Sequence, residues 1–200
     1  MKLVSTPRIE FLRGLATEIL GHYGRGRTIV AIDGSDAGAR AAFADDLAAV
    51  FEEREHASVR ASLEGFGRPR AELHPLGLDT PERHYRHGTD HSALRRALIE
   101  PFRLGGSTGF VTETYDPARD AWVEPTWLTA PADATLVIDG EFMHRPELRE
   151  LWSYGVLLEG GAPSEADRIY LAESKPHERA SAVIDLTDPA LPRRVFAASC

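Results

Sequence analysis

The sequence has very little cysteine, no long apolar run and no excess of basic residues. Cys200 is the one cysteine in 200 residues, so no disulfide can form within the chain, and a reducing cytoplasm is the expected compartment. At a terminus that frays, Cys200 is a poor candidate for a catalytic thiol. No run approaches the roughly 20 apolar residues of a membrane span, and the N-terminus is too poor in apolar residues for a signal peptide. The formal net charge of −8 argues against the basic face that nucleic-acid binding requires.

What the sequence does contain is typical of a globular α/β protein. Apolar residues make up 42% and charged residues 27%, and residues 1–200 fit a single domain with its own core. Short apolar segments alternate with helical patterns, which predicts a five-stranded parallel sheet with helices on both faces. The expected strands are 28–33, 57–63, 134–139, 155–158 and 182–185. The expected helices are 7–23, 39–54, 90–101, 145–152 and 163–174.

The first strand leads into a modified phosphate-binding motif. Gly34 holds the first place of a P-loop, but Ala39, Arg40 and Ala41 stand where that loop has Gly, Lys and Ser or Thr. Arg40 keeps the positive charge in a bulkier form, while Ala41 removes the hydroxyl that would hold Mg²⁺. The predicted phosphate-binding residues are Gly34, Ser35, Asp36, Ala37, Gly38, Ala39, Arg40 and Ala41. The alternative is an ordinary strand–turn–helix that never held phosphate.

Two further stretches are candidates for a binding role. The polar segment 64–90 is long for a connection without regular structure, which indicates a binding segment or a lid. Its motif Arg68-Pro69-Arg70 faces an anionic ligand or is surface charge. His84, His87 and His91 suggest a metal site, although solvated loop histidines are the simpler interpretation, and we predict no metal residue. The segment 105–125 is expected to form a hairpin or an extended excursion.

Seven further segments occur along most of the chain in a characteristic order. They are Phe43-Ala44-Asp45-Asp46-Leu47, Glu64-Gly65-Phe66, Thr80-Pro81-Glu82 to Tyr85, Leu94 to Pro101, Val137-Ile138-Asp139-Gly140, His144 to Leu148 and Arg168 to Glu173. No single segment is decisive, but in their order and spacing together they resemble the uridine kinase-like branch of the P-loop kinases. The resemblance implies a P-loop NTPase-type three-layer sandwich.

The resemblance also implies an activity, the ATP-dependent transfer of a phosphoryl group to a nucleoside 5′-hydroxyl, with Mg²⁺. Glu64 then takes the place of the carboxylate that accepts the hydroxyl proton, and Arg40 acts in a modified catalytic role. The substrate residues that it implies are Phe66, Arg68, Tyr85, Tyr115 and Asp139. From the residues alone, Glu64 is equally a solvated carboxylate, Asp139 a turn former before glycine, and Tyr115 a packing aromatic.

Several departures from the family weaken that activity. Gly67 replaces an aromatic residue or histidine, and Asp120 stands where uridine kinases have a histidine that contacts the substrate. The lid is reduced or absent, because Arg168 is the one arginine between the fourth strand and Tyr170. Phosphoryl transfer depends on positioning and on charge stabilisation. We therefore expect weak, altered or no kinase activity, the alternative being a catalytically inactive nucleotide- or nucleoside-binding or regulatory protein. The partner is a small nucleoside or nucleotide, and the oligomeric state is left open.

Overall fold

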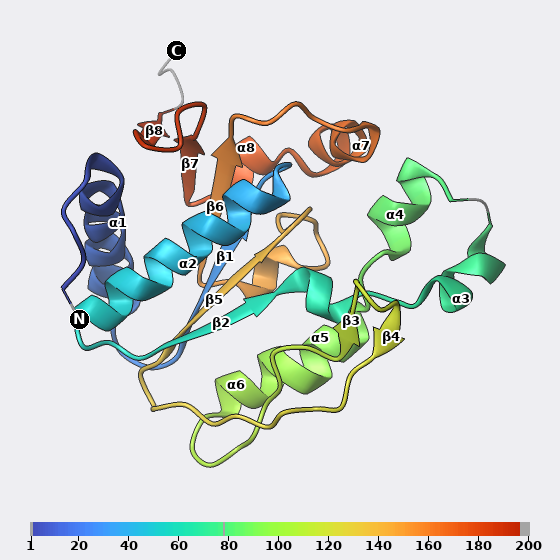
Figure 1. The fold of residues 1–200 in the computed structure, drawn as a ribbon, viewed down its shortest axis with the longest axis horizontal. Helices are drawn as coiled ribbons and strands as arrows, with labels where there is room; N and C mark the ends of the chain where they lie inside the picture. Colours follow the sequence, from blue (N-terminus) through green and yellow to red (C-terminus); the bar gives the residue numbers. More distant parts are fainter. Residues whose placement is uncertain (1, 78, 197–200) are drawn as a thin grey trace.

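The computed structural model describes residues 2–77 and 79–196, so Cys200 lies outside the described residues. A central sheet of six strands has the order β2-β5-β1-β6-β7-β8 (Figure 1). The strands are β1 (Thr28–Asp33), β2 (Ser58–Ser62), β5 (Thr135–Gly140), β6 (Tyr154–Glu159), β7 (Ala182–Asp185) and β8 (Arg193–Val195). A separate two-stranded hairpin pairs β3 (Tyr115–Asp116) with β4 (Ala121–Trp122), as expected for the segment 105–125.

The sheet corrects the prediction of five parallel strands. The five predicted strands are parallel neighbours, but β8 adds a sixth strand, antiparallel to β7. A three-residue strand with two arginines has no apolar alternation, and so it gives no sequence signal. Tertiary contacts hold it in place, since the Arg194 guanidinium donates to the Glu18 carboxylate and to the Ser181 carbonyl.

Helices cover both faces of the sheet, and each face has its own apolar core. On one face α1 (Pro7–Tyr23) and α2 (Ala37–Glu53) pack against alternate strand residues such as Val30 and Ile32. The other face, which includes Ile29, packs against the helical run that extends through α5 and α6 (Figure 1). The remaining helical elements are η1 (Leu63–Phe66), α3 (Arg70–Leu73), η2 (His74–Leu76), α4 (Pro81–His87), α5 (His91–Leu94), η3 (Arg95–Ile99), α6 (Glu100–Leu104), η4 (Arg149–Leu151), α7 (Glu165–Ser174) and α8 (Pro176–Arg179).

Pro101 does not end the helix that begins after Asp90, contrary to the sequence prediction. The run continues through a π-helical segment, η3, in which the Glu100 N–H donates to the Arg95 carbonyl five residues earlier. Pro101 has no N–H for the Ala97 carbonyl, and the Val111 N–H donates to that carbonyl instead, at 3.0 Å. The chain therefore replaces the missing helical hydrogen bond with a tertiary one.

The predicted helix over 145–152 is also shorter than expected. Regular structure there is limited to the three-residue 3₁₀ turn η4. The backbone there makes three-residue turns, in which the Leu148 N–H donates to the Arg145 carbonyl at 3.0 Å and the Leu151 N–H donates to the Leu148 carbonyl at 2.7 Å. The Trp152 indole N–H donates to the Met143 carbonyl at 2.8 Å. Among the described residues, no helix has the length and apolarity needed to cross a membrane.

Candidate functional site

The connection between β1 and α2 is shorter than a full phosphate loop. Asp36 is the N-cap of α2, and its carboxylate accepts a hydrogen bond from the Ala39 N–H at 2.8 Å. Residues 37–41 are therefore helical, so Ala39 carries none of the strain expected for alanine in a P-loop. In the described part of the chain, the N–H groups of Ser35, Asp36, Ala37 and Gly38 have no hydrogen-bond acceptor. Such a run of N–H groups at a helix N-terminus favours an anion.

Arg40 is completely buried and points back beneath this connection. Its guanidinium donates to the Gly34 carbonyl, and it lies 3.3 Å from the Glu64 carboxylate and 3.7 Å from the Glu141 carboxylate. Its Nε has no hydrogen-bond partner among the described residues. The structure thus brings together Arg40 and Glu64, the two predicted catalytic residues, and adds Glu141, which sequence reasoning missed. A signal for Glu141 was available, because it directly follows β5 at the carboxyl edge of the sheet.

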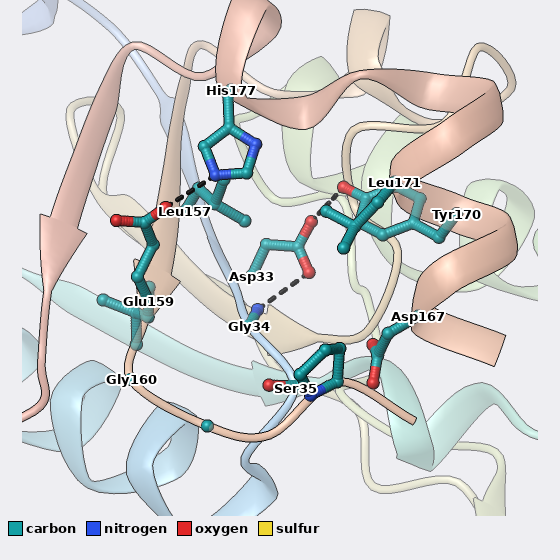
Figure 2. A pocket seen from close by; sticks show the side chains of 13 residues that line it. Asp33, Gly34, Ser35, Leu157, Glu159, Gly160, Asp167, Tyr170, Leu171 and His177 are labelled. Atoms are coloured by element: carbon teal, nitrogen blue, oxygen red, sulfur yellow. Dashed lines mark hydrogen bonds and ion pairs between the residues drawn. The ribbon is translucent and has the colours of Figure 1, made fainter. Parts of the chain in front are cut away.

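Asp33, at the end of β1, anchors a buried polar network that the sequence analysis also missed. Its carboxylate accepts hydrogen bonds from the Gly34 N–H at 2.8 Å and from the Tyr170 hydroxyl (Figure 2). It also accepts one from the Met143 N–H at 3.0 Å. His144 Nε2 lies 4.0 Å from the same carboxylate. Burial raises the pKa of Asp33 and of Tyr170 and lowers the pKa of His144. The network ties β1 to α7 across 137 residues of sequence.

One pocket opens above this network, and we call it the Asp33 pocket. Its volume is about 170 Å³, and its polar lining comes from Asp33, Ser35, Glu159, Asp167, Tyr170 and His177 (Figure 2). His177 Nε2 lies 2.6 Å from the Glu159 carboxylate. Asp167 is the N3 residue of the α7 capping box. Asp33, Glu159 and Asp167 therefore make up most of its ionisable lining, which contains none of the lid arginines that the resemblance implies.

A second cavity lies at the segment 64–90, and we call it the Arg70 cavity. It measures about 370 Å³, and its charged lining consists of Glu64, Arg68, Arg70, Asp79, Arg83, His84 and Glu141. Tyr115 lines it as well. His84 Nε2 lies 2.8 Å from the Glu141 carboxylate. The hydrogen bond to Glu141 raises the pKa of His84, and the pKa of Glu141 is lowered by His84 and Arg40 against the opposing effect of burial.

Three predicted substrate residues lie outside both of these cavities. Phe66 is fully buried in the core. Tyr85 packs against Phe142, and its hydroxyl bonds Ser174. The Asp139 carboxylate lies 2.9 Å from the Arg60 guanidinium, on the face covered by α2. Of the predicted substrate side chains, Arg68 and Tyr115 do line the Arg70 cavity.

Two of the histidines that the sequence analysis considered, and for which it predicted no metal, have separate surroundings. His84 belongs to the Arg70 cavity, whereas His91 is mostly buried, and burial together with Arg145 lowers its pKa to about 4. No group of three or more His, Cys, Asp or Glu side chains within residues 2–77 and 79–196 is arranged to hold a metal ion.

Two solved structures that superpose on this chain are described as kinases. A structure described as a possible uridine kinase from Bacillus stearothermophilus superposes with a TM-score of 0.74 at 23% identity, covering 88% of this chain and 96% of that one. A candidate fructose transport system kinase from Silicibacter sp. TM1040 superposes with a TM-score of 0.62 at 19% identity, covering 90% and 86%. This chain has the P-loop kinase fold. No protein-family model matches the sequence, and no curated protein matches it significantly.

Within the kinase fold, the residues fit a phosphate better than they fit a metal ion. The unpaired N–H groups of residues 35–38 suit a phosphate. Ala41 and Ala42 offer no hydroxyl to Mg²⁺, and the Asp139 carboxylate is engaged by Arg60. The described side chains thus provide no protein-held magnesium site, and we derive no step through one.

Proposed function

We propose that the protein transfers a phosphoryl group from ATP to the hydroxyl of a small, nucleoside-like molecule, with weak or altered activity. The observation that supports this function most directly is the position of Arg40. Its guanidinium contacts the carbonyl of Gly34, which lines the Asp33 pocket, and lies beside Glu64 and Glu141, which line the Arg70 cavity. One buried cation thus connects the phosphate-loop side to the expected acceptor side.

The chemistry assigns a role to each of these groups. ATP, as the donor substrate, supplies the γ-phosphoryl group, and the N–H groups of residues 35–38 are its expected contacts. Glu64 is the general base, because its carboxylate is half-exposed in the Arg70 cavity. The acceptor oxygen loses its proton to Glu64 and forms a bond to phosphorus, while the bond between phosphorus and the bridging oxygen breaks and ADP leaves. Arg40 stabilises the charge that develops between the two sides.

A specific observation supports the alternative, a kinase fold that binds a ligand without phosphoryl transfer. The Asp36 carboxylate caps the same helix N-terminus that a phosphate would approach, and two carboxylates and a carbonyl engage Arg40. Both arrangements oppose binding of a nucleotide triphosphate. They are also our reason for proposing weak activity rather than that of an ordinary kinase.

Calorimetric titration with ATP, with and without Mg²⁺, tests the proposal first. ATP binding, followed by transfer of labelled phosphate to a nucleoside, is the expected result, and the comparison with Mg²⁺ measures whether the metal adds to the affinity. The absence of ATP binding would reject the kinase function and leave the alternative.

The role of Glu64 is tested with Glu64→Gln, which keeps the shape but cannot accept a proton. We expect the transfer rate to fall by about 100-fold or more, with ATP affinity and unfolding free energy unchanged. Glu72→Gln is the matched control, because Glu72 is an exposed carboxylate of the same segment and should leave transfer unchanged. Equal rates for Glu64→Gln and the wild type would contradict the general-base role.

A further inference from the structure

The rim of the Arg70 cavity is held in place by a compact set of contacts. Asp120 accepts hydrogen bonds from the Tyr115 hydroxyl at 2.9 Å and from the Arg70 N–H at 3.0 Å. The Tyr115 ring lies against Gly67 so closely that a Cβ on Gly67 would come within 2.8 Å of it. Asp120 stands where the resemblance leads to a substrate-contacting histidine, and here it fixes the backbone that carries Arg70. The side chain at this position therefore holds the backbone of Arg70 in place.

Most charges of the cavity are already neutralised by a neighbour. Glu64 and Glu141 lie beside Arg40 and His84. Arg83 lies 2.8 Å from the Asp79 carboxylate and donates to the Gly77 carbonyl at 2.5 Å. The three acids that line the cavity, Glu64, Asp79 and Glu141, are therefore offset by Arg40, His84 and Arg83.

Two further cations line the cavity. Arg68 lies 3.3 Å from Asp90, a carboxylate outside the cavity lining. Asp90 also caps α5 through the N–H groups of Ser92 and Ala93, so this carboxylate is shared between Arg68 and the helix N-terminus. The exposed Arg70 side chain makes no ion pair or hydrogen bond with the residues that the structure describes. A guanidinium fork of this kind matches a planar carboxylate or a phosphate with two parallel hydrogen bonds.

We propose that the Arg70 cavity binds an anionic group of the acceptor, a phosphate monoester or a carboxylate, through Arg68 and Arg70. The acceptor is then a hydroxyl compound that already carries a negative charge, with its reactive hydroxyl directed toward Glu64. The identification of this ligand as the acceptor rests on the proposed function. The binding of the anion does not, and it is measurable without ATP.

The test uses three matched probes, which are ribose, ribonate and ribose 5-phosphate, titrated calorimetrically into the whole protein without nucleotide. We expect at least one anion to bind about tenfold or more tightly than ribose, and its affinity to fall as ionic strength rises. Whether ribonate or ribose 5-phosphate binds more tightly distinguishes a carboxylate site from a phosphate site.

The variants Arg68→Ala and Arg70→Ala locate the site. Each variant is expected to lower the affinity for the preferred anion about tenfold and to leave the affinity for ribose unchanged. Arg25→Ala is the charge-matched control, because Arg25 is exposed and does not line the cavity. Anions that bind no more tightly than ribose, or anion binding that survives Arg70→Ala, would overturn the proposal. If the wild-type protein binds the anion but transfers no phosphoryl group, the proposed function is rejected and the anion site is retained.

Discussion

The Asp33 pocket and the Arg70 cavity lie on the two sides of Arg40, and they use charge in opposite ways. In the Asp33 pocket, the central carboxylate is 1% exposed and already accepts three hydrogen bonds from the protein. In the Arg70 cavity the charged groups are more exposed, and Arg70 has no recorded partner among the described residues. Satisfied buried groups stabilise a fold, whereas an accessible unpaired guanidinium can recognise a ligand. Substitutions in the Asp33 pocket should therefore lower the free energy of unfolding, and substitutions in the Arg70 cavity should lower the affinity for a ligand.

The largest expected effect is on stability, from Asp33→Ala. The change leaves the Gly34 and Met143 N–H groups and the Tyr170 hydroxyl without their acceptor. We expect the free energy of unfolding to fall by about 3 kcal/mol, measured by urea denaturation monitored by circular dichroism.

The matched control on the cavity side is Asp79→Ala, which removes a carboxylate that is 92% exposed. Its effect should be within about 0.5 kcal/mol, because exposed ion pairs contribute little. Similar losses for the two variants would break the contrast between the two sides.

An intermediate effect is expected on ATP affinity when the loop is returned to the P-loop pattern. Ala39→Gly, Arg40→Lys and Ala41→Thr together supply a compact ammonium and a hydroxyl for Mg²⁺. If the three changes allow the connection after β1 to adopt the P-loop shape, the affinity for Mg·ATP, measured by calorimetry, should rise by about tenfold.

The single variant Arg40→Lys is the comparison for that triple change. It should give a smaller gain, because Ala41 still offers no hydroxyl to the metal. No gain from the triple variant would show that the connection after β1 has lost phosphate binding.

The smallest expected effect is a pH dependence at the cavity, from His84 and Glu141. A raised histidine pKa stabilises the fold below the unfolded value of about 6.5, and this contribution is lost as the pH rises through the raised folded value. The His84 side chain is 56% exposed, so the change in unfolding free energy should be at most about 1 kcal/mol.

Denaturation over a series of pH values measures this dependence. Glu141→Gln should flatten this pH dependence. Glu82→Gln, on the same helix as His84, should leave it unchanged, because Glu82 pairs with Arg86. An undiminished slope in Glu141→Gln would assign the dependence to another group.

The pattern of neighbouring residues was sufficient to predict most of the central strands and the long helices. The apolar runs predicted β1 and β7 to the residue. The helix expected over 7–23 has these bounds as α1, and the Thr6 hydroxyl caps it by accepting from the Ile9 N–H. Caps and buried strands are specified by neighbouring residues, so a single sequence can reveal them. The kinase fold followed from the order of these elements and from the motifs between them.

The sequence by itself therefore determined the five parallel strands and the first two long helices, the modified loop, and Arg40 and Glu64 as candidate site residues. The tertiary structure alone decided which groups meet, because Asp33 and Tyr170 are 137 residues apart in sequence and Arg40 meets Glu141 only once β5 has paired with β1. It also decided where a local rule fails. Pro101 lies within a helical run because the Val111 N–H, on a distant segment, binds the carbonyl that the proline leaves without a donor. Such contacts depend on long-range packing, which no local window of residues records.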